Sequence, residues 1–269
     1  MMQVVKAHAY GNDFLYVRDA DAATAALPEL ARVLCDRHAG IGADGLIVYT
    51  GDGRHAAMRL FNADGSRAEV SGNGVRALAA WLLRDDLRGS VEITIETAAG
   101  SKRLMRLGRE GERQMFRAEM GAPRKIASER LDAGGETLSV VTLDMGNPHC
   151  VVLGPLPDEE RFRRLGAALE RHRRFPEGTN VEFVHLDAPD RLRILIWERG
   201  VGPTASSGTG TCASLVAAAS YGGSAREADV TAPGGTQRVE WRADGIYLTG
   251  WAEVVCRVEW LGRIPPVSP

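Results

Sequence analysis

The chain has 269 residues, of which 44% are hydrophobic and 25% are charged, and its formal net charge is −2. This composition is typical of globular proteins and allows one large domain or two of about 130 residues each. The near-neutral charge argues against a nucleic-acid partner. No apolar run approaches the roughly 18 residues of a membrane span, so we also expect no membrane association.

The cysteines and the first residues indicate a compartment. The first residues lack the apolar core of a secretory signal. The four cysteines, Cys35, Cys150, Cys212 and Cys256, lie far apart and form no C-x-x-C pair. A disulfide framework and a zinc site are therefore poor interpretations. We expect a cytoplasmic protein in a reducing environment, with no bound metal.

Runs of β-branched residues, often alternating with polar ones, predict strands along the whole chain. In chain order these runs are 3–10, 45–50, 56–61, 91–97, 114–120, 139–145, 149–154, 180–186, 191–198, 237–243, 245–250 and 252–260. Apolar residues at helical spacing predict helices near 28–38, 72–84, 158–173 and 208–221. The basic segment 161–174 is interpreted as the solvated face of an amphipathic helix.

Several landmarks recur in the two halves of the chain at one spacing. A Gly-Asn pair precedes an apolar run twice, and a Ser-Gly-x-Gly turn opens a predicted helix twice. From Asn12 to Asn147 the offset is 135 residues, and from Ser71 to Ser207 it is 136. A shared offset indicates an internal duplication. The sequence predicts two homologous lobes, 1–117 and 118–258, with a final strand at 259–269 that returns to the first lobe.

The many strands and few helices predict an α/β (α+β) fold. Each lobe is expected to be a strongly curved mixed sheet wrapped around one helix. The helix that follows Ser71 is rich in Ala and Leu, and the helix that follows Ser207 is rich in Ala and other small residues. We expect these two helices to be the buried ones.

The two Ser-Gly turns have more than one interpretation. Serine is a preferred N-cap, and for either turn alone the cap is the favoured reading. A helix N-terminus can also bind an anion, although neither turn has the Lys of a P-loop or the spacing of a nucleophile elbow. If the lobes close face to face, a carboxylate held in one cleft would have one side chain on each side of its α-carbon. That geometry suits inversion of a stereocentre, for which Cys is the better base and Ser the weaker one.

The chain resembles the diaminopimelate epimerase family over nearly its whole length and in the family's order. The matching segments are GNDFLYV, DRHAGIGADGLIV, FNADGSRAEVSGNGVRALA, MGNPHCVV, RFPEGTNVEFV, ERGVGPTASSGTGTCAS and APGGTQRVEW. The resemblance implies two lobes related by a pseudo-twofold axis. It also implies a cofactor-independent epimerase of lysine and cell-wall precursor synthesis, acting on a small amino-acid substrate. We also expect a homodimer.

The resemblance implies a cysteine from each lobe as the acid–base pair, and these positions are Ser71 and Ser207 here. A second departure is Pro203, where the family usually has Glu. His149 and Glu198 are expected as polar supports beside the acid–base pair. The resemblance places these residues at the substrate: Asn12, Asn62, Gly72, Asn73, Asn147, Asn180, Glu198, Arg199, Gly208 and Thr209.

These residue types suit a zwitterionic ligand. Asn supplies donors and acceptors without a net charge, and Arg199 offers a bidentate grip on a carboxylate. Each Asn also has a simpler interpretation as a turn residue, which applies most to Asn62 and Asn73. For His149 the simpler interpretation is a hydrogen-bonded, partly buried imidazole. We interpret His38 as structural and Cys212 as unable to replace Ser207.

Three hypotheses remain from the sequence. The chain is a diaminopimelate epimerase whose two cysteines were changed to serine, with weak or absent turnover. Alternatively, it is a natural relative that isomerises or racemises another amino or organic acid. Finally, it is a non-catalytic protein that binds an amino-acid-like ligand. We favour the first, because the expected Asn and Arg residues are all present.

Overall fold

The chain divides into two compact units in the structure, which is a computed structural model describing residues 2–23, 25–68 and 70–266. The N-terminal lobe comprises Met1–Ala118 and Trp251–Pro269, and the C-terminal lobe comprises Glu119–Gly250. The chain thus returns to the first lobe at Trp251, and the C-terminal lobe ends at Gly250 rather than at 258. The reason is that the runs predicted at 245–250 and 252–260 form one continuous strand, β17 (Gly245–Trp260). Residues 267–269 of the expected final strand lie outside the described residues.

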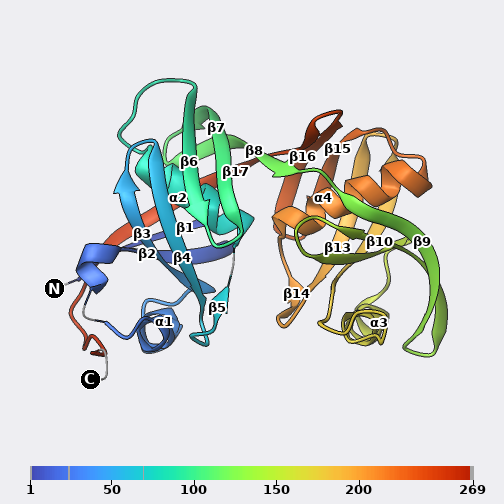
Figure 1. Ribbon diagram of the computed structural model, residues 1–269, viewed down its shortest axis with the longest axis horizontal. Helices are drawn as coiled ribbons and strands as arrows, with labels where there is room; N and C mark the ends of the chain where they lie inside the picture. Colours follow the sequence, from blue (N-terminus) through green and yellow to red (C-terminus); the bar gives the residue numbers. More distant parts are fainter. Residues whose placement is uncertain (1, 24, 69, 267–269) are drawn as a thin grey trace. The chain divides into compact units, whose positions relative to one another are not determined.

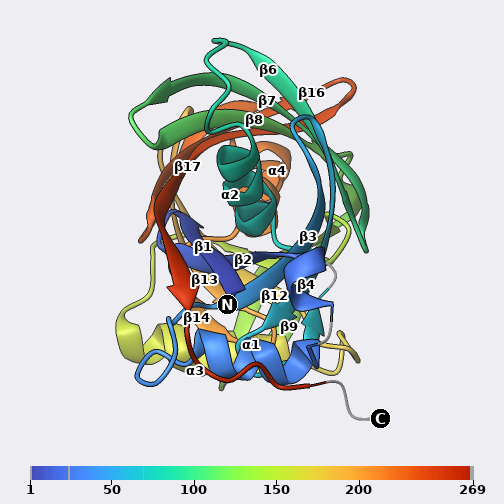
Figure 2. The ribbon, with the colours of Figure 1, turned by 90° about the vertical axis from the view of Figure 1, so that its left-hand side faces the viewer.

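The N-terminal lobe contains most of its elements before residue 121 (Figure 1). They are β1 (Met2–Ala9), β2 (Asn12–Arg18), a 3-10 turn (Asp19–Ala22), α1 (Leu27–Cys35), β3 (Gly45–Asp52), β4 (His55–Asn62), β5 (Arg67–Ala68), α2 (Gly72–Leu82), β6 (Val91–Thr97), β7 (Gly100–Glu110) and β8 (Arg113–Gly121). Strand β17 pairs with both β1 and β8, so the strands of this lobe form a closed ring. Figure 2 shows α2 lying inside that ring.

The C-terminal lobe contains the remaining elements and repeats the order of strands and α-helices from β10 onward. They are β9 (Arg124–Ala133), β10 (Glu136–Asp144), β11 (Pro148–Leu153), α3 (Glu159–Glu170), β12 (Asn180–Ala188), β13 (Arg191–Glu198), β14 (Gly202–Thr204), α4 (Gly208–Ala217), a π-helical turn (Ala218–Gly222), β15 (Glu227–Ala232), β16 (Gly235–Arg242) and the start of β17.

The pairing of strands is the same in both lobes. Strands β1 and β2 are antiparallel, β2 and β3 parallel, β3 and β4 antiparallel, and β4 and β6 parallel. The counterparts β10, β11, β12, β13 and β15 follow this sequence of directions without exception. The register also matches, because Phe14 lies opposite Gly45 in one lobe and His149 opposite Asn180 in the other. The predicted duplication is therefore present in the topology.

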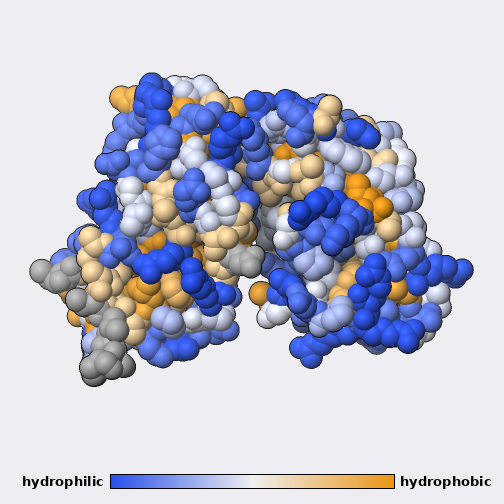
Figure 3. Space-filling view, viewed as in Figure 1, coloured by the Kyte–Doolittle hydropathy of each residue, from blue (hydrophilic) through white to orange (hydrophobic). Residues whose placement is uncertain are grey.

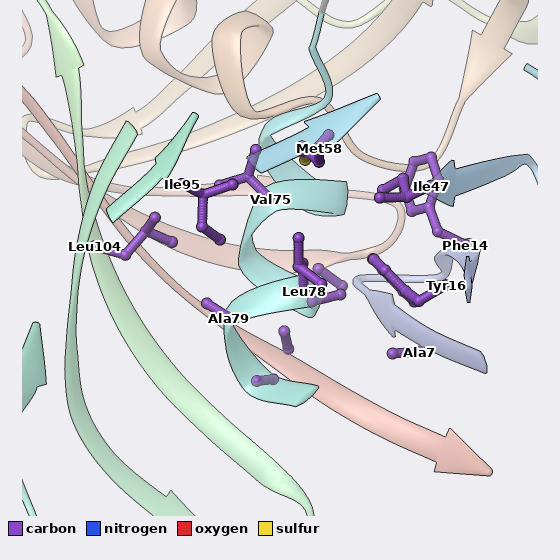
Figure 4. Packing of buried hydrophobic residues seen from close by; sticks show 14 of the residues in the cluster. Ala7, Phe14, Tyr16, Ile47, Met58, Val75, Leu78, Ala79, Ile95 and Leu104 are labelled. Atoms are coloured by element: carbon purple, nitrogen blue, oxygen red, sulfur yellow. The ribbon is translucent and has the colours of Figure 1, made fainter. Parts of the chain in front are cut away.

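Each lobe has one core around its central helix and another beneath an outer helix. In the N-terminal lobe, Val75, Leu78 and Ala79 of α2 pack against side chains from the surrounding strands, including Ile95 and Leu104 (Figure 4). In the C-terminal lobe, Leu215 and Val216 of α4 occupy the equivalent core. Residues on the two central helices are almost all buried, as predicted from their small and apolar side chains.

The outer helices cover a second apolar layer. Helix α3 buries Phe162, Leu165 and Leu169 and exposes Arg163 and Arg164, as the amphipathic pattern predicted. Hydrophilic residues cover much of the surface over this helix (Figure 3). Helix α1 buries Leu30 and Leu34 in the same way in the other lobe. In the part of the chain that the structure describes, no helix is both long and apolar enough to cross a membrane.

The four predicted helices and the predicted strands are confirmed, but several strands were missed. Those absent from the prediction are β2, β5, β7, β9, β14 and β15. Strands β7 and β9 expose most of their residues, many of them charged, so their sequences lack a clear apolar alternation. Strands β5 and β14 have only two and three residues, too few to produce a pattern.

Candidate functional site

Both central helices begin at a serine that caps them. The Ser71 hydroxyl oxygen accepts a hydrogen bond from the Gly74 N–H at 3.1 Å, and Ser207 accepts from the Gly210 N–H at 3.2 Å. The N-cap interpretation is therefore confirmed for both turns. Both serines remain half-buried rather than enclosed. Each hydroxyl also keeps its hydrogen for a bond to another group.

An asparagine lies against the first turn of each central helix. Asn73 Nδ2 donates to Asn12 Oδ1 at 3.3 Å in the N-terminal lobe. Asn147 Nδ2 donates to Thr209 Oγ1 at 3.4 Å in the C-terminal lobe. These four predicted residues thus form two equivalent pairs. Gly72 and Gly208 are the first residues of the two helices. In each lobe, the free N–H groups and the positive end of the helix dipole therefore lie beside that lobe's pair.

A charged cluster holds Asn12 in the N-terminal lobe. Asn12 Nδ2 donates to Asp44 Oδ2 at 2.7 Å, and Arg37 bridges Asp44 and Asp13 with two contacts of 2.8 Å. Lys6 lies 2.9 Å from Asp13. Burial raises the pKa of Asp13, but the hydrogen bonds from Arg37 and Lys6 outweigh it and hold the pKa below its usual value. Sequence reasoning gave no role to Arg37 or Asp44, although both lie in the DRHAGIGADGLIV segment.

A fully buried histidine–glutamate pair holds Asn147 in the C-terminal lobe. His149 Nδ1 lies 2.8 Å from Glu182 Oε1, and His149 Nε2 lies 3.0 Å from Asn147 Oδ1. His149 and Glu182 are both 0% exposed. His149 was predicted as a polar support, with a buried imidazole as the simpler alternative, and the structure places it beneath Asn147. Glu182 was missed, although a single Glu in the apolar run NVEFV was the available signal.

Asn180 and Arg199 are connected through the backbone. Asn180 donates to the Pro148 carbonyl at 3.0 Å and accepts from the Arg199 N–H at 3.1 Å. The Arg199 side chain is exposed and donates to the Glu177 carbonyl at 3.3 Å. It lines a cavity of about 660 Å³ together with residues 170–173, 175–178 and Gly200. Glu198, the last residue of β13, is half-buried next to it.

Asn62 matches its simpler interpretation. Its side-chain amide donates to the Ser66 hydroxyl at 2.9 Å, and its backbone N–H donates to the Ser66 carbonyl. The residue is exposed at the end of β4. The described bonds of Asn62 therefore stabilise its own turn.

Three of the cysteines are buried and poorly suited to proton transfer. Burial raises the pKa of Cys35 to about 12 and also raises the pKa of Cys150. Cys212 is 0% exposed within α4, as expected from its place on the helix. Cys256 is exposed on β17. Among the described residues, no group of three or more His, Cys, Asp or Glu side chains is arranged to hold a metal ion.

The fold defines a structural class, a duplicated α+β fold in which each lobe wraps a curved mixed sheet around one helix. The structure of a probable proline racemase from Agrobacterium radiobacter matches with a TM-score of 0.74. The match covers 97% of this chain and 93% of that one at 17% sequence identity. At this identity the likeness establishes the fold alone.

The sequence comparisons then identify the family. The family model described as diaminopimelate epimerase matches residues 4–126 and 141–255. Diaminopimelate epimerase of Desulforudis audaxviator is 40% identical over 97% of this chain and 99% of that protein. Diaminopimelate epimerase of Desulfitobacterium hafniense is 39% identical over 94% and 96% of the two chains. The chain belongs to the diaminopimelate epimerase family.

Proposed function

We propose that this protein is a cofactor-independent isomerase that interconverts LL- and meso-diaminopimelate. It removes the proton from one face of one α-carbon and adds a proton to the opposite face. The observation that carries the proposal is the half-site built twice, in which a Ser-capped helix N-terminus meets an amide side chain. The full-length similarity to proteins named diaminopimelate epimerase supports the choice of substrate. The same similarity supports a role in lysine biosynthesis.

Each half-site has a distinct part in the proposed reaction. The N-terminal N–H groups of α2 and α4 stabilise the substrate carboxylate and the negative charge that develops when the α-proton leaves. Asn12, Asn73 and Asn147 present amides to the ligand's polar ends. Ser71 and Ser207 occupy the two acid–base positions, one for each face of the α-carbon. Arg199 binds a carboxylate of the substrate, and Glu198 binds an ammonium group beside the acid–base positions.

Serine at both positions makes this chain a weak catalyst in our proposal. A hydroxyl is a poor base unless a neighbouring group activates it. The oxygen of each serine already accepts a helix N–H, which further lowers its basicity. Cys35, Cys150 and Cys212 are too deeply buried to replace the missing thiols. We further propose that the protein is a cytoplasmic homodimer that binds one amino-acid substrate per chain.

Restoring both thiols tests the proposal. Ser71→Cys with Ser207→Cys should raise epimerisation of diaminopimelate by several orders of magnitude, because a positioned acid–base group contributes roughly 10² to 10⁴ in rate. Loss of the caps should cost about 0.5–2 kcal/mol per helix, so folding is checked by circular dichroism. Ser71→Ala with Ser207→Ala is the matched control, since it removes the same caps without adding thiols.

A folded double-thiol variant that stays inactive on both isomers would overturn the epimerase proposal. Other amino and organic acids would then be screened as substrates. Binding of a ligand without any exchange of its α-proton would instead indicate a non-catalytic homologue.

A further inference from the structure

The histidine–glutamate pair of the C-terminal lobe is unusual for a protein interior. Both side chains are 0% exposed. Glu182 Oε2 has no hydrogen-bond partner among the described residues. An unpaired buried carboxylate oxygen carries a large desolvation cost. A group kept at such a cost requires an explanation beyond packing.

The N-terminal lobe shows that the fold does not need this pair. The strand registers make Phe14 the counterpart of His149 and Ile47 the counterpart of Glu182. We call the strand residues that lie beneath each central helix its floor. The central helix approaches its floor equally closely in both lobes. A Cβ at Gly74 would lie 2.8 Å from Ile47 Cδ1, and one at Gly210 would lie 2.6 Å from Glu182 Oε1. An apolar pair therefore suffices beneath α2, whereas the equivalent positions beneath α4 hold the polar pair.

The orientation of the Asn147 amide determines where one proton of the pair lies. An amide oxygen can only accept, so with Asn147 Oδ1 facing the ring, as in the structure, His149 Nε2 carries the hydrogen of their 3.0 Å contact. The 2.8 Å contact between His149 Nδ1 and Glu182 Oε1 needs one more proton, on either atom. Both placements leave the pair with no net charge, which suits its complete burial.

This proton arrangement in turn stabilises that direction of the Asn147 amide. With its oxygen held by His149 Nε2–H, the amide turns its NH₂ group toward Thr209 in the first turn of α4. An imidazole without the Nε2 hydrogen would favour the reverse orientation, with the amide oxygen outward. The NH₂ group is a donor that a carboxylate can accept, and it lies beside the helix N–H groups that favour an anion.

We propose that Glu182 is a positioning residue that, through His149, holds the Asn147 amide as a hydrogen-bond donor for the carboxylate of the substrate. Glu182 keeps a proton at the far side of the ring, His149 presents Nε2–H to Asn147, and Asn147 presents its NH₂ group to the ligand. The identity of the ligand rests on the proposed function, whereas the proton arrangement does not.

Three variants separate positioning from packing. Glu182→Gln can still donate an N–H to His149 Nδ1, so we expect affinity for meso-diaminopimelate within about threefold of the unaltered protein. Glu182→Ile removes the partner of Nδ1, and we expect at least a tenfold loss of affinity by calorimetry. Glu182→Ile with His149→Phe reproduces the apolar pair of the other lobe. This double variant should recover stability in urea but not affinity.

Nitrogen NMR on ¹⁵N-histidine protein provides a second readout. The His149 signal, assigned by its loss in His149→Phe, should show a protonated Nε2 in the unaltered protein and in Glu182→Gln. An unprotonated Nε2 in the unaltered protein would overturn the proposal. Full affinity in the apolar double variant would also overturn it, because the pair would then be structural only. If no diaminopimelate isomer binds the unaltered protein, the proposed function fails, and the NMR result alone decides the role of Glu182.

Discussion

The two lobes share a backbone and differ in the residues beneath their central helices. In both, a strand-start asparagine meets the first turn of a serine-capped helix. Beneath α2 the floor is apolar, with Phe14 and Ile47, whereas beneath α4 it holds His149 and Glu182. The charged groups of the N-terminal lobe lie instead beside Asn12, around Asp13 and Asp44.

This difference shows how a duplicated fold can bring two unlike environments to matching positions. The shared parts are backbone features, namely helix ends, caps and strand registers, which either floor can support. The parts that differ are those that orient the amides. Asn12 is held by an exposed carboxylate, Asp44, and Asn147 by a fully buried imidazole. We therefore expect changes to the two floors to have unequal consequences.

Exchanging the floors should have the largest effect. Ile47→Glu places a carboxylate beneath α2 with no histidine partner, and we expect a loss of about 3–5 kcal/mol, the cost of an uncompensated buried charge. Adding Phe14→His should recover part of that loss by recreating the pair. Urea unfolding gives the free energies, and amide hydrogen exchange in α2 and α4 assigns the loss to one lobe. A cost below about 1 kcal/mol for Ile47→Glu would contradict the view that this floor must be apolar.

The two helix glycines sharpen the comparison at a smaller scale. Gly210→Ala presses a methyl group on Glu182 Oε1, which His149 holds in place, and should cost about 1–3 kcal/mol. Gly74→Ala presses mainly on the flexible end of Ile47, and its contact with the capping serine is shared by Gly210. Its cost is partly offset by the gain of about 1 kcal/mol in helix propensity, so the net change should be near zero. Thermal and urea unfolding of the two variants should rank them in this order, and equal costs would count against a rigid Glu182.

Acid should weaken the N-terminal lobe through a residue that the other lobe lacks. The pKa of Asp13 lies below its ordinary 3.8 when folded, because the bonds from Arg37 and Lys6 outweigh burial. Its contribution is therefore present above 3.8 and is lost as the pH falls through the lower folded value. Its counterpart by the 135-residue offset is Pro148. Asp13→Asn should cost about 1–2 kcal/mol at pH 7, and the gap to the unaltered protein should close at acid pH. A gap that is constant down to pH 2 would contradict this assignment.

The sequence predicted the repeated parts better than the parts that differ. The four helices, the duplication and both serine caps followed from spacing and from capping preference, which are local properties. Glu182 and Asp44 were missed because their roles depend on strand pairing, which brings β12 beside β11 and joins the loop at Asp44 to Asn12. The return to the N-terminal lobe was predicted at 259, whereas β17 already enters that lobe at Trp251 and continues to Trp260.

The proposed function requires that the two half-sites act on opposite faces of one α-carbon, and single thiols test this requirement most directly. Ser71→Cys and Ser207→Cys are prepared separately, and exchange of the substrate α-proton in deuterated water is followed by proton NMR on LL- and meso-diaminopimelate. A lone thiol can remove a proton and return a deuteron on its own face, so each variant should exchange one isomer, and the two variants should prefer different isomers. Exchange of the same isomer by both folded variants, or exchange by neither, would contradict the claim.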